Sequence, residues 1–125
     1  MVHVTTVTED VSPASLEVLA TRTGRSRFPV VQRRRVRGFV HVKDVLGYVG
    51  ASRRAPVPAE VYRPLAVVPL DRTLADLLLS MRREGRHMVL VSDGRRPLGV
   101  VTLDDVLAAI VGGIGTKGAR VVAGA

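Results

Sequence analysis

Two segments of this chain repeat each other, and the repeat limits what the chain can fold into. Residues 38–46 (GFVHVKDVL) match residues 99–107 (GVVTLDDVL) at five of nine positions, 61 residues apart. Just upstream, residues 27–31 (RFPVV) align with residues 87–91 (HMVLV) at a spacing of 60, which predicts one extra residue in the second turn. Self-similarity of this kind indicates a duplicated structural unit. We therefore expect two copies of one fold.

Each copy has the sequence pattern of a βαββα unit. Ser12 before Pro13, and Thr73 with Asp76, are typical of helix N-termini. Apolar residues at helical spacing indicate the helices, and short apolar runs joined by polar turns indicate strands. The pattern predicts a mixed α/β (α+β) protein of two tandem repeats packed with pseudo-two-fold symmetry. The expected elements are a strand at 2–7, a helix at 13–23, strands at 28–31 and 36–40 and a helix at 42–49, then a strand at 65–70, a helix at 74–84, strands at 88–91 and 98–101 and a helix at 103–111.

The domain boundaries follow from the repeat. We expect the first copy at residues 1–50, a proline-containing linker at 51–64, the second copy at 65–112 and a flexible glycine-rich tail at 113–125. A lone unit of about 60 residues buries too small a fraction of its surface to be stable. The two copies are therefore expected to pack on each other. Hydrophobic residues make up 46% of the chain, which is enough for such a core.

The chain is strongly basic, with a formal charge of +8 from 19 basic and 11 acidic residues. Such an excess is typical either of polyanion binding or of a solvated, arginine-rich surface. Arg33, Arg34, Arg35 and Arg37 crowd the first expected hairpin, where they would steer a polyphosphate, touch an acidic partner or remain solvated. Because aromatic side chains, which stack on bases, make up only 3% of the chain, we expect no nucleic-acid partner.

Several classes of protein are disfavoured by what the sequence lacks. There is no cysteine, which excludes disulfides and thiolate metal sites and fits a reducing compartment. No apolar run reaches the roughly 18 residues of a membrane span, and no signal peptide is evident. The histidines are scattered, and no nucleophile lies beside a base. We therefore expect a soluble chain that is neither an enzyme nor a metal-binding protein.

Four motifs resemble the tandem cystathionine-β-synthase (CBS) domain pair, or Bateman module, of CorC/CNNM-type (hemolysin-like) magnesium and cobalt transporters. They are TGRSRFPVV (23–31), VHVKDVL (40–46), YRPLAVVP (62–69) and GVVTLDDVLAAIVG (99–112). The resemblance implies a cytoplasmic regulatory module of a longer protein in the cell membrane, joined to its membrane domain and forming a homodimer through its helices. The alternatives are a basic nucleic-acid-binding module and a purely structural dimerisation domain.

The resemblance also implies a ligand, an adenosine nucleotide (ATP or AMP, with or without Mg²⁺), in the second copy. Thr102 and Asp105 lie at an expected strand–helix junction, where free backbone N–H groups suit a phosphate. Thr102 can donate to a phosphate or ribose oxygen, and Asp105 can accept from both ribose hydroxyls. Alternatively, Thr102 only caps the helix and Asp105 only favours its dipole. The other candidates are Gly99 for close backbone approach, Met88 and Val67 beside the adenine, and His87 near a phosphate.

The first copy departs from this pattern. His41 replaces the threonine, while Asp44 retains the carboxylate. The imidazole would fill the cleft, pair with phosphate when protonated, or merely pack at the strand end. We therefore expect a weaker or empty second site formed by His41, Asp44 and Phe28, with Arg27 occupying the place that His87 has in the second copy.

Overall fold

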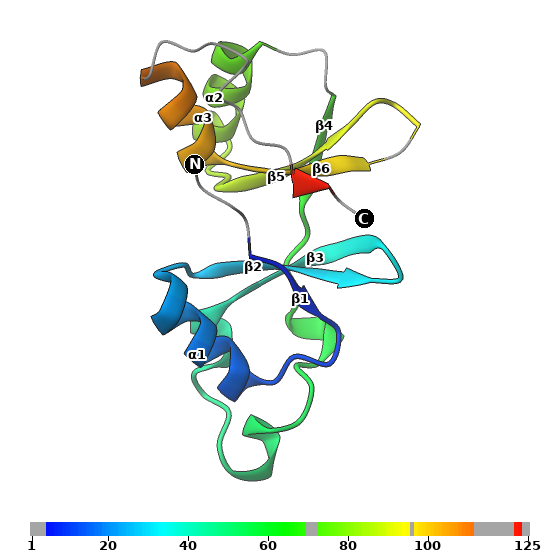
Figure 1. Cartoon of the computed structure of the whole chain (residues 1–125), viewed down its shortest axis with the longest axis vertical. Coiled ribbons are helices and arrows are strands. Elements are labelled where there is room, and N and C mark those ends of the chain that lie inside the picture. Colours follow the sequence, from blue (N-terminus) through cyan, green and yellow to red (C-terminus); the bar gives the residue numbers. More distant parts are fainter. Residues whose placement is uncertain (1–4, 70–72, 96, 112–121, 124–125) are drawn as a thin grey trace. The chain divides into compact units, whose positions relative to one another are not determined.

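The computed structural model describes residues 5–69, 73–95, 97–111 and 122–123, which form two compact units (Figure 1). The first unit is Thr5–Pro64 and the second begins at Leu65. Both follow the predicted order of strand, helix and antiparallel strand pair, so the predicted mixed α/β class is confirmed. Among these described residues, no helix is long and apolar enough to span a membrane.

The first unit is a three-stranded sheet with one helix against it (Figure 1). Its elements are β1 (Val7–Thr8), α1 (Pro13–Thr23), β2 (Arg27–Gln32), β3 (Arg35–His41) and the 3₁₀ turn η1 (Val42–Val45). Strand β1 runs parallel to β2, and β3 runs antiparallel to it. As predicted, the Ser12 hydroxyl accepts from the Ser15 N–H and caps α1. The core consists of Val7, Leu16, Phe28, Val30, Val40, Val45 and Val57.

The second unit has the same order of strands and one additional edge strand. Its elements are β4 (Ala66–Pro69), α2 (Leu74–Arg83), β5 (Met88–Ser92), β6 (Pro97–Thr102), α3 (Leu103–Val111) and β7 (Val122–Ala123). Thr73 caps α2 by accepting from the Asp76 N–H, as predicted. The two helices pack together on one face of the sheet (Figure 1). The core consists of Val68, Leu74, Leu77, Met81, Val89, Val91, Val101, Val106 and Ala109.

The strand pairing corrects the predicted alignment of the two copies. Arg27 lies opposite His41 and Met88 lies opposite Thr102, so the spacing between the copies is 61 residues in both strands of the hairpin. The predicted extra residue in the second turn is wrong, and Arg27 corresponds to Met88 rather than to His87. A one-residue slip would turn every side chain of the strand to the other face of the sheet, so the core specifies the register.

The closing helices of the two units also differ, and here one prediction is wrong. The expected helix at 103–111 is present as α3, but the expected helix at 42–49 is reduced to the single turn η1. Gly47 stands in the first unit where Ala108 stands in the second. A glycine inside a helix costs about 1 kcal/mol relative to alanine. The first unit therefore lacks the long helix that would follow β3.

The segment predicted as a linker is folded against the first unit. It contains the 3₁₀ turns η2 (Gly50–Arg53) and η3 (Ala59–Val61), and Val57 between them is 3% exposed. Arg63 then pairs with Phe39 of β3 through two backbone hydrogen bonds of 2.8 and 2.9 Å. In the second unit β7 pairs with β6 at the same place, beside Gly99 and Val100. The rest of the tail predicted as flexible, 113–121 and 124–125, lies outside the described residues.

Candidate functional site

The junction between β6 and α3 places Thr102 beside Asp105 in the second unit. Thr102 ends β6 opposite Met88, and the Leu103 N–H donates to the His87 carbonyl oxygen at 2.8 Å. The Asp105 N–H donates to Thr102 Oγ1 at 3.1 Å. Thr102 therefore caps α3. Helix capping was one of the two roles that the sequence suggested for it, beside contact with a ligand. Its hydroxyl hydrogen still allows it to donate to an oxygen of a ligand.

Asp105 is the unusual residue of this junction, because one of its oxygens has no hydrogen-bond partner among the described residues. The residue is 3% exposed, and Oδ2 is buried without a donor among the described residues. An unsatisfied buried acceptor costs about 1–3 kcal/mol, and a charged one costs more. A carboxylate carries two acceptor oxygens and no donor, so hydroxyl groups on a ligand would satisfy it. Helix capping and the helix dipole alone do not explain this orphan oxygen.

Two further predicted residues lie at the same junction. Met88 is directly opposite Thr102 and 7% exposed, while His87, which is exposed, immediately precedes it and holds the first turn of α3 through its carbonyl. Side chains alternate along a strand, and Val101 and Val89 face the core. Thr102 and Met88 therefore share the opposite face of the sheet. The structure thus brings together Thr102, Asp105, Met88 and the His87 backbone.

Val67 and Gly99 lie farther from this junction. Val67 belongs to β4 on the other side of β5, opposite Leu90, and its side chain is 62% exposed. Gly99 precedes Thr102 by three residues, about 10 Å along a strand. It is buried between Val91 of β5 and Ala123 of β7. Gly99 therefore lies between two neighbouring strands.

In the first unit the carboxylate that corresponds to Asp105 is that of Asp44, and both of its oxygens accept hydrogen bonds from Arg63. Arg63 donates from Nε to Asp44 Oδ2 at 2.7 Å and from a terminal guanidinium nitrogen to Oδ1 at 2.8 Å. This hydrogen bonding lowers the pKa of the Asp44 carboxyl below its ordinary value and raises that of Arg63. Asp44 is the counterpart of Asp105, 61 residues earlier. The two equivalent carboxylates therefore differ: Asp44 is hydrogen-bonded on both oxygens, whereas Asp105 has a buried oxygen that no described residue pairs with.

His41 is also engaged within the first unit. Its Nδ1 accepts from the Lys43 N–H at 3.2 Å, so the imidazole caps η1. Burial lowers the pKa of His41 below its ordinary value, and the charges of Arg27 and Arg63 lower it further. Both effects favour the neutral form of the imidazole. The interpretation of His41 as a packing residue at the strand end fits this geometry better than a charged phosphate contact; the structure adds its role as a cap.

Phe28 is not placed beside His41. Its side chain is fully buried in the core of the first unit, opposite Val40. With the corrected register its counterpart is Val89, another core residue, and not Met88. We therefore leave Phe28 out of the candidate site.

Arg63 is the residue that the sequence interpretation missed. It lies in the segment predicted as a linker, 19 residues after Asp44, and no local pattern joins the two. Arg63 belongs to the motif YRPLAVVP (62–69), and a second sequence signal for its position is Gly38 of β3. This glycine has a φ of 139°, and a Cβ atom there would lie 2.5 Å from the Arg63 carbonyl oxygen. A glycine at this point of β3 is therefore required by a close backbone approach.

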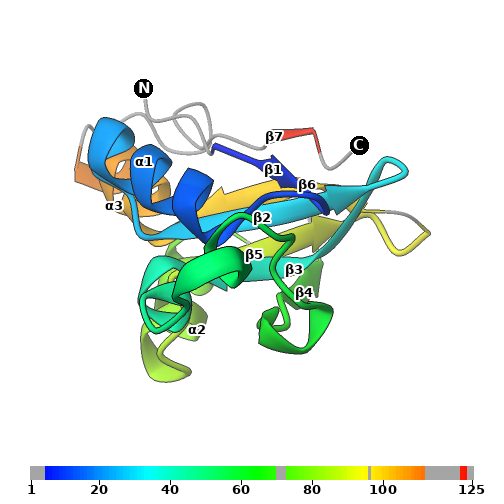
Figure 2. The same cartoon turned by 90° about the horizontal axis from the view of Figure 1, so that it is seen from below.

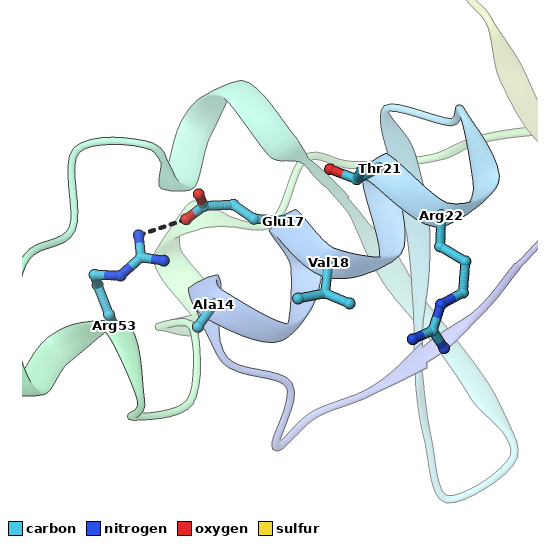
Figure 3. A pocket seen from close by; sticks show the side chains of 6 residues that line it. All are labelled: Ala14, Glu17, Val18, Thr21, Arg22 and Arg53. Carbon is cyan, nitrogen blue, oxygen red and sulfur yellow. Dashed lines mark hydrogen bonds and ion pairs between the residues drawn. The ribbon is translucent and has the colours of Figure 1, made fainter.

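The first unit has two other surface features that could bind a ligand, a hollow beside α1 and an arginine-rich turn. A hollow of about 610 Å³ lies between α1 and η2 and is lined by Ala14, Glu17, Val18, Thr21, Arg22 and Arg53 (Figure 3). Glu17 and Arg53 point toward one another and form an ion pair, so these two charges are already used within the unit. None of the predicted site residues lines this hollow.

In the part of the chain that the structure describes, no group of three metal-ligating side chains is found.

The arginine-rich turn between β2 and β3 lies at the end of its sheet away from α1 (Figures 1 and 2). Arg33 and Arg34 have positive φ angles of 51° and 64°, and both are exposed. A hairpin turn of this kind normally takes asparagine or glycine at such positions. The turn is therefore strained, and it places two arginines in solvent.

Comparison with known proteins supports the interpretation of the repeat. A family model described as CBS domain matches residues 2–51 and 59–112. An uncharacterized protein of Mycobacterium tuberculosis is 40% identical over 92 residues, 73% of this chain and 26% of that protein. The magnesium and cobalt efflux protein CorC of Vibrio cholerae is 36% identical over 81 residues, 63% of this chain and 28% of that protein. The chain therefore spans about a quarter of the length of these relatives.

Solved structures agree with this comparison. The CBS domain of a bacterial CNNM/CorC-family Mg²⁺ transporter in complex with ATP superposes with a TM-score of 0.72 at 28% identity, covering 88% of this chain and 80% of that chain. A functionally unknown conserved domain from Neisseria meningitidis MC58 superposes with a TM-score of 0.67 at 28% identity, covering 82% of this chain and 68% of that chain.

Proposed function

Because the chain belongs to the CBS-domain family, we propose that it is a regulatory module that binds an adenosine nucleotide at the β6–α3 junction of its second unit. The observation that carries this proposal is the buried Oδ2 of Asp105, which has no donor among the described residues. A binding site can retain such a group at a cost to folding, because the ligand satisfies it.

The chemistry of the junction suits a ribose attached to a phosphate. Vicinal hydroxyls of the ribose donate to the Asp105 carboxylate, and the Thr102 hydroxyl donates to a ribose or phosphate oxygen. The first turn of α3 supplies the positive end of a helix dipole. Met88, beside Thr102, provides an apolar surface for the base. This arrangement supports binding, and the proposal includes no catalytic step.

The relatives suggest what such binding regulates. One similar CBS domain, from a Mg²⁺ transporter, has been solved in complex with ATP, and relatives of this chain are named magnesium and cobalt efflux proteins. We propose that this chain is the cytoplasmic nucleotide sensor of a membrane ion transporter of the CorC/CNNM type. Homodimer formation, and a role for Mg²⁺ bound to the nucleotide phosphates, are further parts of the same proposal.

Calorimetric titration with ATP and with AMP, each with and without Mg²⁺, tests this function. We expect one molar equivalent of at least one of these nucleotides to bind. Guanosine nucleotides provide the control for recognition of the base, and 2′-deoxy-ATP provides the control for recognition of the diol by Asp105. A chain that binds neither ATP nor AMP, with or without Mg²⁺, would contradict the proposal.

A further inference from the structure

We propose that Arg63 closes the first unit's counterpart of the nucleotide site, so that the chain binds one nucleotide although its fold is duplicated. This inference rests on the proposed function of the second unit. It assigns to Arg63 the role of a specificity-determining residue, one that decides which of two equivalent carboxylates is available to a ligand.

The two carboxylates occupy equivalent places in the two units. Asp44 and Asp105 each follow the last residue of the third strand by three positions, and the strands before them pair in the same register. The Val42 N–H donates to the Ser26 carbonyl at 2.8 Å, which repeats the bond from Leu103 to His87. A ligand that is recognised by Asp105 would therefore meet a similar backbone at Asp44.

The first difference between the two sites is the guanidinium of Arg63. It forms two hydrogen bonds, of 2.7 and 2.8 Å, to the two oxygens of Asp44. A ribose diol would need the same two oxygens, so the arginine and the diol compete for one group. At Asp105, by contrast, Oδ2 has no donor from any described residue.

The backbone fixes the arginine in this position. The Arg63 N–H and carbonyl both pair with Phe39 of β3, and the carbonyl approaches Gly38 so closely that only glycine fits there. The chain therefore delivers the side chain of Arg63 to Asp44 from a strand-like segment, not from a free loop. This makes the contact a built feature of the first unit.

His41 is a second difference, and the experiment must separate it from Arg63. Its imidazole stands where Thr102 stands and accepts the Lys43 N–H. We therefore use His41→Thr as the common background, which restores the hydroxyl. Asp105→Leu is added to remove the second unit's site. Any nucleotide that is then bound reports on the first unit alone.

In this background Arg63→Met should lower the Kd for ATP at the first site at least about tenfold, compared with the parent variant that keeps Arg63. The reason is that the substitution removes a charged group that competes with the ligand for Asp44. Arg63→Gln should do the same. Arg54→Met removes the same charge from an exposed residue and should have no such effect. The pKa of Asp44, measured by carboxyl NMR, should rise when Arg63 is replaced.

Two results would overturn the inference: ATP binding in the parent variant as tight as in the Arg63→Met variant, or no binding in either. Failure of the proposed function is a different observation, namely that the wild-type chain binds no adenosine nucleotide or binds it independently of Asp105. Thermal melting of each variant confirms that the chain being titrated is folded.

Discussion

Asp105→Leu should stabilise the ligand-free chain and at the same time abolish its response to ATP. Leucine has a similar shape and carries no acceptor, so it removes the cost of the unpaired buried oxygen. We expect the free energy of unfolding to rise by about 1 kcal/mol, which corresponds to about 3–5 °C in Tm for a domain of this size. A residue that lowers stability and is needed for binding is typical of a functional site.

The same variant should lose stabilisation by nucleotide. A ligand present at 100 times its Kd stabilises the folded state by about 2.7 kcal/mol, and this shift should be absent in Asp105→Leu. Asp104→Leu is the matched control, because Asp104 precedes Asp105 in the same turn of α3 but is exposed. It should keep the ATP shift. A drop in the ligand-free Tm of Asp105→Leu, together with an intact ATP shift, would contradict the account.

Phe28→Ala should cause the largest loss of stability of any single change in the first unit. The side chain is fully buried among Val7, Leu16 and Val30. Truncation of a buried phenylalanine to alanine costs about 3–5 kcal/mol, from lost burial and from the cavity left behind. Urea denaturation should show this as a fall in the midpoint or as loss of the folded state.

Two further variants make the Phe28 prediction specific. Val18 of α1 is 54% exposed, so Val18→Ala should change the free energy of unfolding by less than about 0.5 kcal/mol. Phe28→Leu keeps most of the core volume and should leave ATP affinity unchanged, because Phe28 lies in the core and not at the site. A clear loss of ATP affinity in a folded Phe28→Leu chain would show that the residue contributes to a ligand site after all.

The repeat predicted most of the fold because the features behind it are local. Capping by Ser12 and Thr73, the apolar stripe of α2 and the short apolar runs of the strands all depend on residues close in sequence. The alignment of β2 with its counterpart β5 was predicted incorrectly. An uninterrupted apolar run such as residues 88–91 fits two alignments equally well. The short closing turn of the first unit differs from the prediction because Gly47 stands where the second copy has Ala108, so the repeat is not exact at this helix.

The site was predicted only in part, and the reason is that its decisive features are not local. The sequence showed Thr102 and Asp105 at a strand–helix junction, but it could not show that Oδ2 of Asp105 is buried without a partner in the part of the chain that the structure describes. It also showed Asp44 as an apparently equivalent carboxylate. Its partner Arg63 lies 19 residues later in a segment that no local pattern connects to Asp44, and it reaches Asp44 through backbone pairing to Phe39.

The central claim is that ATP binds at Asp105 and leaves Asp44 paired with Arg63. The most direct test is an NMR titration of the wild-type chain labelled with ¹³C at the aspartate carboxyl carbons. We expect ATP to shift the Asp105 carboxyl resonance, and we expect this shift to saturate at one molar equivalent of ATP. The Asp44 resonance and the lowered pKa of Asp44 should not change. A shift of the Asp44 resonance while that of Asp105 stays in place would contradict the account.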